Sequence, residues 1–197
     1  RNYPKGNQGN EEDLALMADV ARGDENAFAK IVEKHQPAVL GTVAKMTNQS
    51  PDTEDIAQQV FIRLWKSAER YQPTAKFTTF LFTITRNLVF NATRKKSGKN
   101  ESSFDALEEN WGQSIEDKNS DSRPDKSIEQ NELRQEIDRA ISSLPEKQRL
   151  AVILRRYEKM PYEEIASTLE ISVPAVKSQL FRARTALRES LGRYLKE

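Results

Sequence analysis

The residues best suited to binding chemistry lie near the C-terminus, in the run VPAVKSQLFRARTALRES that starts at Val173. A helix that enters the major groove of DNA needs side-chain donors near its N-terminus for base edges and arginines beside them for phosphates. Lys177, Ser178 and Arg182 supply both kinds of group. An exposed Phe181 among these cations gains little in water, but it can pack on a thymine methyl group. The run therefore predicts a DNA-binding helix, although a solvated basic surface helix would carry a similar charge.

This helix needs a partner helix and a tight turn to hold it. The apolar residues of one predicted buried stripe recur at helical spacing: Val176, Leu180, Ala183, Leu187 and Leu191. Ser172 stands before Val173-Pro174 as an N-cap with proline in the first turn, and Pro145 and Pro161 suit the first turns of two earlier helices. The pattern predicts a helix-turn-helix over 144–195, with its turn at Glu170-Ile171-Ser172.

A second group of cations follows an aromatic-rich run, FTTFLFTITRNLVFNATRKK, from Phe77 to Lys96. Aromatic side chains interleaved with cations bind single-stranded nucleic acid, by stacking on bases and by neutralising phosphates. The alternative is that most of these phenylalanines belong to a core, and we prefer that interpretation for Phe80. A loop over 69–76, rich in short polar residues and containing Pro73, precedes the predicted helix.

Another helix is predicted to open at Ser50-Pro51, with a cap and a proline in its first turn, and it has an unusually wide apolar face. Its apolar residues spread over about half of the circumference, wider than the roughly 100° stripe that packing on one neighbour requires: Ile56, Ala57, Val60, Phe61, Leu64 and Trp65. Either this helix is central to its own bundle, or it presents a protein-docking face around Gln58, Gln59, Ile62 and Trp65. Periodicity alone does not separate the two.

Composition narrows the function classes. Basic and acidic side chains number 15 and 11 over 1–100, 5 and 12 over 101–143, and 11 and 7 over 144–197, so an acidic segment separates two basic ones. The absence of cysteine excludes disulfides and thiolate metal sites and fits a reducing cytoplasm. The only histidine, His35, lies in a helical run and is expected to be structural. No run is apolar enough for a membrane helix.

The chain is predicted to be all-α, with two small helical domains joined by a flexible acidic linker. The first domain spans 11–97, with a helix from Glu11, a second capped by Asp24 and a third starting at Pro37. The linker spans 98–127, is rich in Ser, Asn, Asp and Glu, and has Trp111 as its one large apolar residue. The second domain spans 128–197 and contains the helix-turn-helix.

Two segments resemble a known family, the extracytoplasmic-function class of bacterial sigma factors. YEEIASTLEIS followed by VPAVKSQLFRAR is similar to the end of that family's second domain, with Pro174-Ala175 in place of the common Gly-Thr. DTEDIAQQVFIRLWKSAERYQPTAKFTTFLFTITRNLVFNATRKK resembles the segment that docks on the polymerase clamp and melts the upstream promoter. Its departures from the family pattern are Gln59, Phe80, Thr85 and Asn91. Together the matches cover most of 11–97 and 128–195.

The resemblance implies a monomeric cytoplasmic sigma factor without cofactor, metal or catalytic residue. The partners it implies are promoter DNA, an anti-sigma factor, and the clamp helices and flap of core RNA polymerase. The residues it assigns are Asp55, Gln58, Gln59, Ile62 and Trp65 for core binding; Tyr71, Lys76, Arg86, Asn87, Asn91, Arg94 and Lys95 for the −10 element; and Pro174, Lys177, Ser178, Phe181, Arg182, Arg184 and Arg188 for the −35 element.

Two other functions compete with that of a sigma factor. A conventional helix-turn-helix regulator with an N-terminal interaction domain would bind DNA by itself, but a ligand sensor is expected to show a pocket-forming α/β pattern, and 11–97 reads as purely helical. An enzyme is disfavoured because the sequence has no Gly-rich phosphate loop, no His/Cys metal cluster and no nucleophile triad. Co-purification with core polymerase separates the sigma factor from the conventional regulator.

Overall fold

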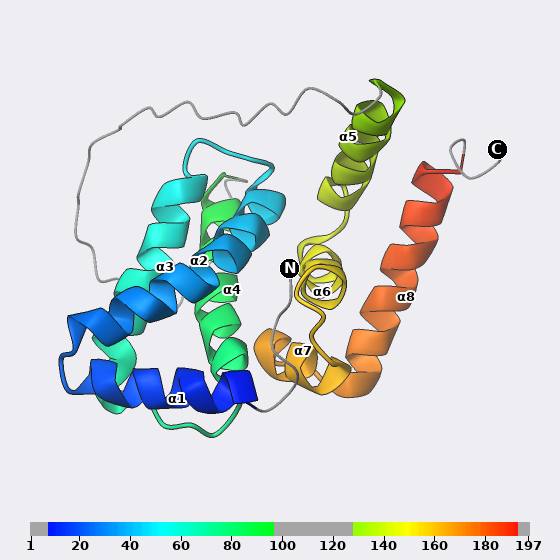
Figure 1. The fold of residues 1–197 in the computed structure, drawn as a ribbon. Coiled ribbons are helices and arrows are strands. Elements are labelled where there is room, and N and C mark those ends of the chain that lie inside the picture. Colours follow the sequence, from blue (N-terminus) through cyan, green and yellow to red (C-terminus); the bar gives the residue numbers. More distant parts are fainter. Residues whose placement is uncertain (1–7, 97–127, 193–197) are drawn as a thin grey trace.

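The computed structural model describes residues 8–96 and 128–192, and these residues form helices joined by short connections (Figure 1). The N-terminal helices are α1 (Gln8–Ala21), α2 (Glu25–Thr47), α3 (Thr53–Ser67), the short 3₁₀ helix η1 (Ala68–Arg70) and α4 (Phe77–Lys96). The C-terminal helices are α5 (Ile128–Ser142), α6 (Glu146–Arg156), α7 (Tyr162–Leu169) and α8 (Val173–Ser190). The described ranges contain no strand, so the all-α prediction is confirmed. The predicted linker over 98–127 lies outside the described residues, and the domain boundaries remain a proposal.

Helix α2 corrects one prediction, because it passes through Pro37 without a break. A proline inside a helix removes one backbone donor and crowds the preceding turn. Here the ring is exposed, while Ala38 and Val39 immediately after it are buried in the core. Burial of these apolar neighbours on one continuous stripe offsets the lost hydrogen bond, so the prediction of a separate helix starting at Pro37 was wrong.

The predicted N-cap of α2 is confirmed, but that of α3 is not. The carboxylate of Asp24 accepts hydrogen bonds from the amides of Asn26 and Ala27, at 2.8 and 3.1 Å. Helix α3 begins only at Thr53, so Pro51 lies in the preceding turn and not in the first helical turn as expected. Ser50 instead orders that turn by accepting the amide of Asp52 at 3.3 Å.

The four longer N-terminal helices surround one apolar core. Its innermost side chains are fully buried: Met17, Ile31, Val39, Val43, Met46, Val60, Leu64, Phe77 and Leu81. The aromatic-rich run contributes heavily to this core, because Phe77, Phe82 and Phe90 are all buried. The core interpretation therefore holds for these three phenylalanines.

The helix-turn-helix prediction is confirmed in α7 and α8. Glu170 ends α7 with a left-handed backbone, φ 54°, and Ser172 caps α8 by accepting the amide of Ala175 at 3.3 Å. Val176 and Ala183 are fully buried, so the predicted stripe faces the domain core. The turn directs α8 across the outer side of α6 and α7 (Figure 1).

The two helical groups pack directly against each other. Helix α4 contacts α7, and α2 contacts both α5 and α6. Figure 1 shows α7 beside the lower part of α4, and α6 between the N-terminal helices and α8. One continuous hydrophobic cluster runs through both groups. Within 8–96 and 128–192, no helix combines the length and apolar character needed to cross a membrane.

Candidate nucleic-acid and polymerase interfaces

The outer face of α8 presents a set of exposed polar side chains around one exposed aromatic ring. Phe181 is 69% exposed, the largest exposure among the large hydrophobic side chains of the described residues. The other predicted −35 residues are also exposed: Pro174, Lys177, Ser178, Arg182, Arg184 and Arg188. Because Val176, Leu180 and Ala183 occupy the buried side, this face can enter a DNA groove without opening the core.

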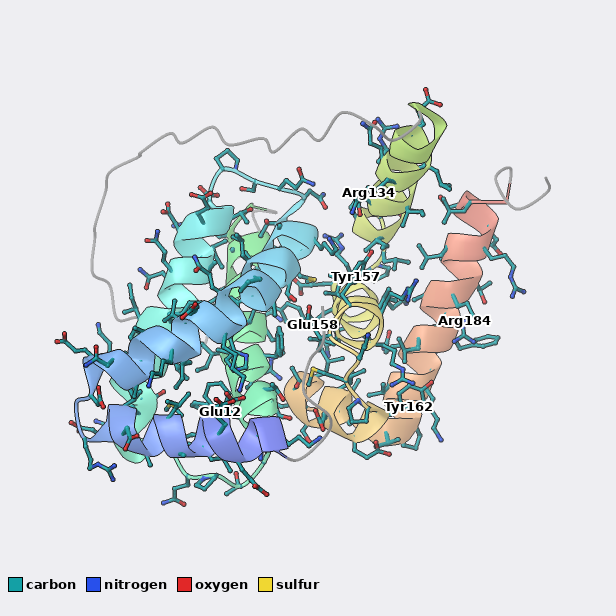
Figure 2. The ribbon with its side chains drawn as sticks, viewed as in Figure 1. Glu12, Arg134, Tyr157, Glu158, Tyr162 and Arg184 are labelled. Atoms are coloured by element: carbon teal, nitrogen blue, oxygen red, sulfur yellow. The ribbon has the colours of Figure 1, made fainter. Side chains whose placement is uncertain are left out.

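An apolar groove of about 620 Å³ lies on the other side of α8, and sequence reasoning missed it. Its floor is apolar and comes from α5, α6 and α8: Ile137, Ile141, Val152, Leu180, Leu187 and Leu191. Its rim is cationic, with Arg155, Arg156 and Arg184, and Figure 2 shows Arg184 on α8. The guanidinium of Arg155 lies 5.0 Å from the ring centre of Tyr162. The signal was present in the sequence, because the stripe of α8 continues to Leu187 and Leu191, beyond the residues that α7 can cover.

A second apolar groove, of about 590 Å³, runs between α2 and α3. Ile62 is 42% exposed at its edge, and Trp65 packs edge-on against Phe28 with ring centres 5.0 Å apart. Gln58, like Ile62 and Trp65, lines the groove, while Asp55 and Gln59 are exposed on the same helix. The bundle interpretation is confirmed for Val60 and Leu64, which are fully buried. Other residues of the wide apolar face, Ala57, Phe61 and Trp65, line the open groove, and the protein-docking face stays a prediction.

Tyr71, the aromatic residue of the loop before α4, is more tightly packed than expected for a loop that captures a base. The ring of Tyr71 lies 4.7 Å from that of Phe80, and its hydroxyl is buried without a hydrogen-bond partner in the described part of the chain. Burial, and then the negative charge of Asp13, raise the pKa of Tyr71 above its ordinary value. Lys76, at the other end of the loop, forms an ion pair with Glu164 of α7 at 2.6 Å.

The predicted −10 residues of α4 divide into an exposed group and one buried member. Asn87, Asn91, Arg94 and Lys95 are exposed. Arg86 is only 7% exposed, because its guanidinium donates to the carbonyl of Thr168 at 2.7 Å and to the carboxylate of Glu170 at 2.8 Å. The structure thus places four of these residues on an open face and encloses the fifth against the helix-turn-helix.

A buried cluster at the junction of α1 and α2 accounts for the single histidine. His35 is 2% exposed, with Nε2 3.1 Å from a carboxylate oxygen of Asp13, and the same carboxylate pairs with Lys34 at 2.7 Å. Burial alone would lower the pKa of Lys34, but hydrogen bonds to Asp13 and Glu12 outweigh it and raise that pKa. Among the described residues, no group of carboxylate and imidazole side chains has the arrangement of a metal site. The expected structural role of His35 agrees with this burial.

A cleft of about 280 Å³ lies beside this cluster and between the two helical groups. Lys34 and His35 line it from α2, and Glu158 and Lys159 line it from the turn after α6. Tyr157 and Glu158 directly follow α6 (Figure 2). The ammonium of Lys45, from α2, lies 4.7 Å from the ring centre of Tyr157. Burial raises the pKa of Glu158 to about 7, although the charge of Lys45 opposes the shift.

Comparison with known proteins gives two family matches along the chain. The Sigma-70 region 2 family matches residues 31–98, and the Sigma-70, region 4 family matches residues 134–187. The first match contains all of α4 and the α2/α3 groove except Phe28. The second contains the helix-turn-helix and the basic face of α8 up to Leu187, so that Arg188 lies just beyond it.

Curated relatives extend over nearly the whole chain. The RNA polymerase sigma-H factor of Pseudomonas aeruginosa is 29% identical over 191 residues, which cover 95% of this chain and 97% of that protein. The ECF RNA polymerase sigma-E factor of Escherichia coli K12 is 33% identical over 176 residues, covering 89% and 92% of the two chains.

Solved structures share the fold. The sigma factor RpoE of Bartonella quintana, solved with the anti-sigma factor NepR, aligns with a TM-score of 0.61 at 22% identity, over 84% of this chain and 96% of that one. CnrH, solved with the cytosolic domain of CnrY, aligns with a TM-score of 0.68 at 22% identity, over 92% and 98%. Taken with the sequence relatives and the two family matches, this agreement leads to one conclusion: the chain belongs to the ECF family of RNA polymerase sigma factors.

Proposed function

We propose that the protein is a non-enzymatic, cytoplasmic promoter-specificity subunit that directs bacterial RNA polymerase to particular promoters. The observation that carries this proposal is the exposed face of α8, where Lys177, Ser178 and Arg182 surround a Phe181 ring that is 69% exposed. A ring this exposed among cations costs solubility, and a thymine methyl group or a deoxyribose in the major groove would cover it.

The −35 element is bound by this face as a duplex. Lys177, Ser178, Phe181 and Arg182 lie toward the bases, with Pro174 at the start of the helix, and Arg184 and Arg188 lie nearer the phosphates. Each good base contact contributes roughly 1–3 kcal/mol of discrimination, whereas phosphate contacts add affinity without sequence preference. The −35 sequence is therefore selected by a few side chains on the first turns of α8.

Core polymerase binds at the two apolar grooves. The clamp helices occupy the α2/α3 groove, where Gln58, Ile62 and Trp65 offer an amide beside apolar surface. The flap occupies the α5/α6/α8 groove, whose apolar floor and arginine rim suit an apolar segment with acidic flanks. Asp55 and Gln59 lie at the periphery of the first contact.

The −10 element is opened and held as a single strand along α4 and the loop before it. Extruding a base costs a few kcal/mol, which stacking and hydrogen bonds in the loop from Tyr71 to Lys76 must return. Arg86, Asn87, Asn91, Arg94 and Lys95 face the upstream part of this element. An anti-sigma factor binds the free protein, as the anti-sigma factor NepR binds the sigma factor RpoE of Bartonella quintana.

Run-off transcription with purified core polymerase on genomic fragments tests the proposal. The chain added to core should give discrete promoter-dependent transcripts that core alone does not give, and it should co-purify with core. The conventional regulator alternative predicts tight sequence-specific DNA binding without polymerase and no new start sites when the chain is added to core. That result would refute the proposed function.

A further inference from the structure

We infer that the chain regulates its own −10 surface. Two carboxylates at the ends of α7 form ion pairs with Lys76 and Arg86, and these pairs take the place of contacts between the two cations and DNA phosphates. This inference rests on the proposed function of those two residues. The pairing makes the closed chain described above and the promoter-bound chain mutually exclusive. Helix α7 of the −35-reading domain is thus an internal competitor for the −10-reading domain.

The Arg86 contact is the stronger half of this pairing. Its guanidinium makes two hydrogen bonds to α7 and the turn after it, with the Thr168 carbonyl and the Glu170 carboxylate, and two more to the amide oxygen of the neighbouring Asn87. At 7% exposure, the Arg86 side chain has no surface left for a phosphate or a base. The pKa of Glu170 is lowered by its hydrogen bond to Arg86 and by the charge of Arg86, which agrees with a genuine ion pair.

The Lys76 contact lies further along the same helix. The ammonium of Lys76 is 2.6 Å from the carboxylate of Glu164, a side chain that is only 15% exposed. Glu164 and Glu170 thus stand at the two ends of α7, and each one holds a cation of the N-terminal domain. Two carboxylates on one helix, each paired with a cation predicted to bind the same DNA strand, match the charge pattern of a nucleic-acid backbone.

Further contacts hold the closed arrangement without involving the DNA-binding residues. Arg149 of α6 donates to the carbonyl of Met46 at the end of α2, at 2.9 Å. Lys45 stacks over Tyr157, and Thr93 of α4 donates to the carboxylate of Glu146. Because these contacts persist when the α7 carboxylates are neutralised, the Glu164 and Glu170 pairs should adjust the closed population without deciding it alone.

The test uses the full chain with Glu164→Gln and Glu170→Gln combined. The matched control is Glu163→Gln with Glu189→Gln, which removes the same two charges from exposed positions of the C-terminal domain that form neither pair. Because the chain has no cysteine, donor and acceptor dyes can be placed at Glu33→Cys of α2 and Ser190→Cys of α8 without background labelling. Energy transfer between the dyes reports closure, and binding of a fluorescent single-stranded −10 oligonucleotide reports access.

The Glu164→Gln/Glu170→Gln variant should show lower energy transfer than the control, because its closed population is reduced. It should also bind the oligonucleotide about three- to tenfold more tightly, the range expected for two partly exposed ion pairs. Energy transfer equal to that of the control would overturn the inference, and so would reduced transfer with unchanged oligonucleotide affinity. Arg86→Ala in the opened variant tests the proposed function separately. If that change leaves oligonucleotide binding intact while energy transfer still reports opening, Arg86 is not a −10 residue, but α7 still closes the chain.

Discussion

Two turns of the C-terminal domain each depend on one residue with left-handed backbone. Lys159, between α6 and α7, has φ 57°, and Glu170, between α7 and α8, has φ 54°. A residue with a side chain pays roughly 1–2 kcal/mol for this conformation, whereas glycine adopts it freely. Glu170 gains an ion pair with Arg86 at this position, and no comparable pair involves Lys159 among the described contacts.

Lys159→Gly should therefore be more stable than Lys159→Ala by about 1 kcal/mol, because only glycine relieves the left-handed strain. Both substitutions remove the same ammonium, so charge is matched between them. Chemical denaturation of the two variants measures the difference. Equal unfolding free energies would show that the turn is not strained at Lys159.

At the level of the single helix, we expect α8 to separate sequence specificity from DNA affinity along its length. Arg182→Ala should change which −35 sequences are accepted, at a cost of roughly 1–3 kcal/mol for the preferred base pair. Arg188→Ala should weaken binding to all sequences alike and reduce the salt slope by about 0.9, because it removes one phosphate contact. Selections on a randomised −35 library, repeated at several salt concentrations, measure both effects. An Arg182→Ala profile with the same shape as that of the unchanged chain would place the reading face elsewhere.

The α2/α3 groove gives a second prediction for a single element. Gln58→Ala combined with Ile62→Ala should weaken binding to core polymerase by about 1–3 kcal/mol, as expected when side chains central to an interface are truncated. Trp65 is left in place because it packs on Phe28, and its loss would also disturb the fold. Arg63→Ala, an exposed change on the same helix, is the control. If the double variant keeps its full helicity and its affinity for core polymerase is unchanged, the α2/α3 groove does not bind the clamp helices.

Sequence patterns predicted these helices well wherever burial and capping agree. The Ser172 cap appeared as expected, because it depends only on residues within one turn of the helix. The predicted buried stripe of α8 is confirmed for Val176, Leu180 and Ala183, whereas Leu187 and Leu191 are only partly buried and line a groove. The predicted break at Pro37 is absent, because the burial of Ala38 and Val39 keeps the helix continuous. Periodicity does not reveal how strongly these two residues pack. The enclosure of Arg86 was equally hidden, since its partners Thr168 and Glu170 lie 82 and 84 residues away along the chain.

At the scale of the whole molecule, we expect closure of the cleft between the domains to depend on pH. Burial raises the pKa of Glu158 from its ordinary 4.5 to about 7, with Lys45 opposing the shift. Between pH 4.5 and about 7, the carboxyl group of Glu158 therefore keeps its proton in the closed form, whereas it has released that proton in a more open or unfolded chain. The stability of the closed form is fully present below pH 4.5 and falls as pH rises toward about 7. The other charged and titratable groups of the cleft are Asp13, Lys34, His35, Lys76, Lys159 and Glu164.

Energy transfer between dyes on α2 and α8 should accordingly fall as pH rises from 4.5 to about 7. The change should be worth roughly 1 kcal/mol once solvent screening of this partly exposed group is included. Glu158→Gln cannot release a proton, so its energy transfer should stay nearly constant over the same range. The variant keeps every other charged group of the cleft. A pH dependence that persists in Glu158→Gln would assign the effect to one of those groups.

The pairing of α7 with Lys76 and Arg86 also bears on how the protein searches a chromosome. Genomic DNA offers about 10⁶–10⁹ competing sites whose attraction is almost entirely electrostatic. A free chain that neutralises two of its own cations has fewer charges to lend to those sites, so it spends less time on irrelevant DNA and more time available to polymerase. Concealing a cation until the right complex forms thus sharpens selection at the genomic level, with no change in any contact to the promoter itself.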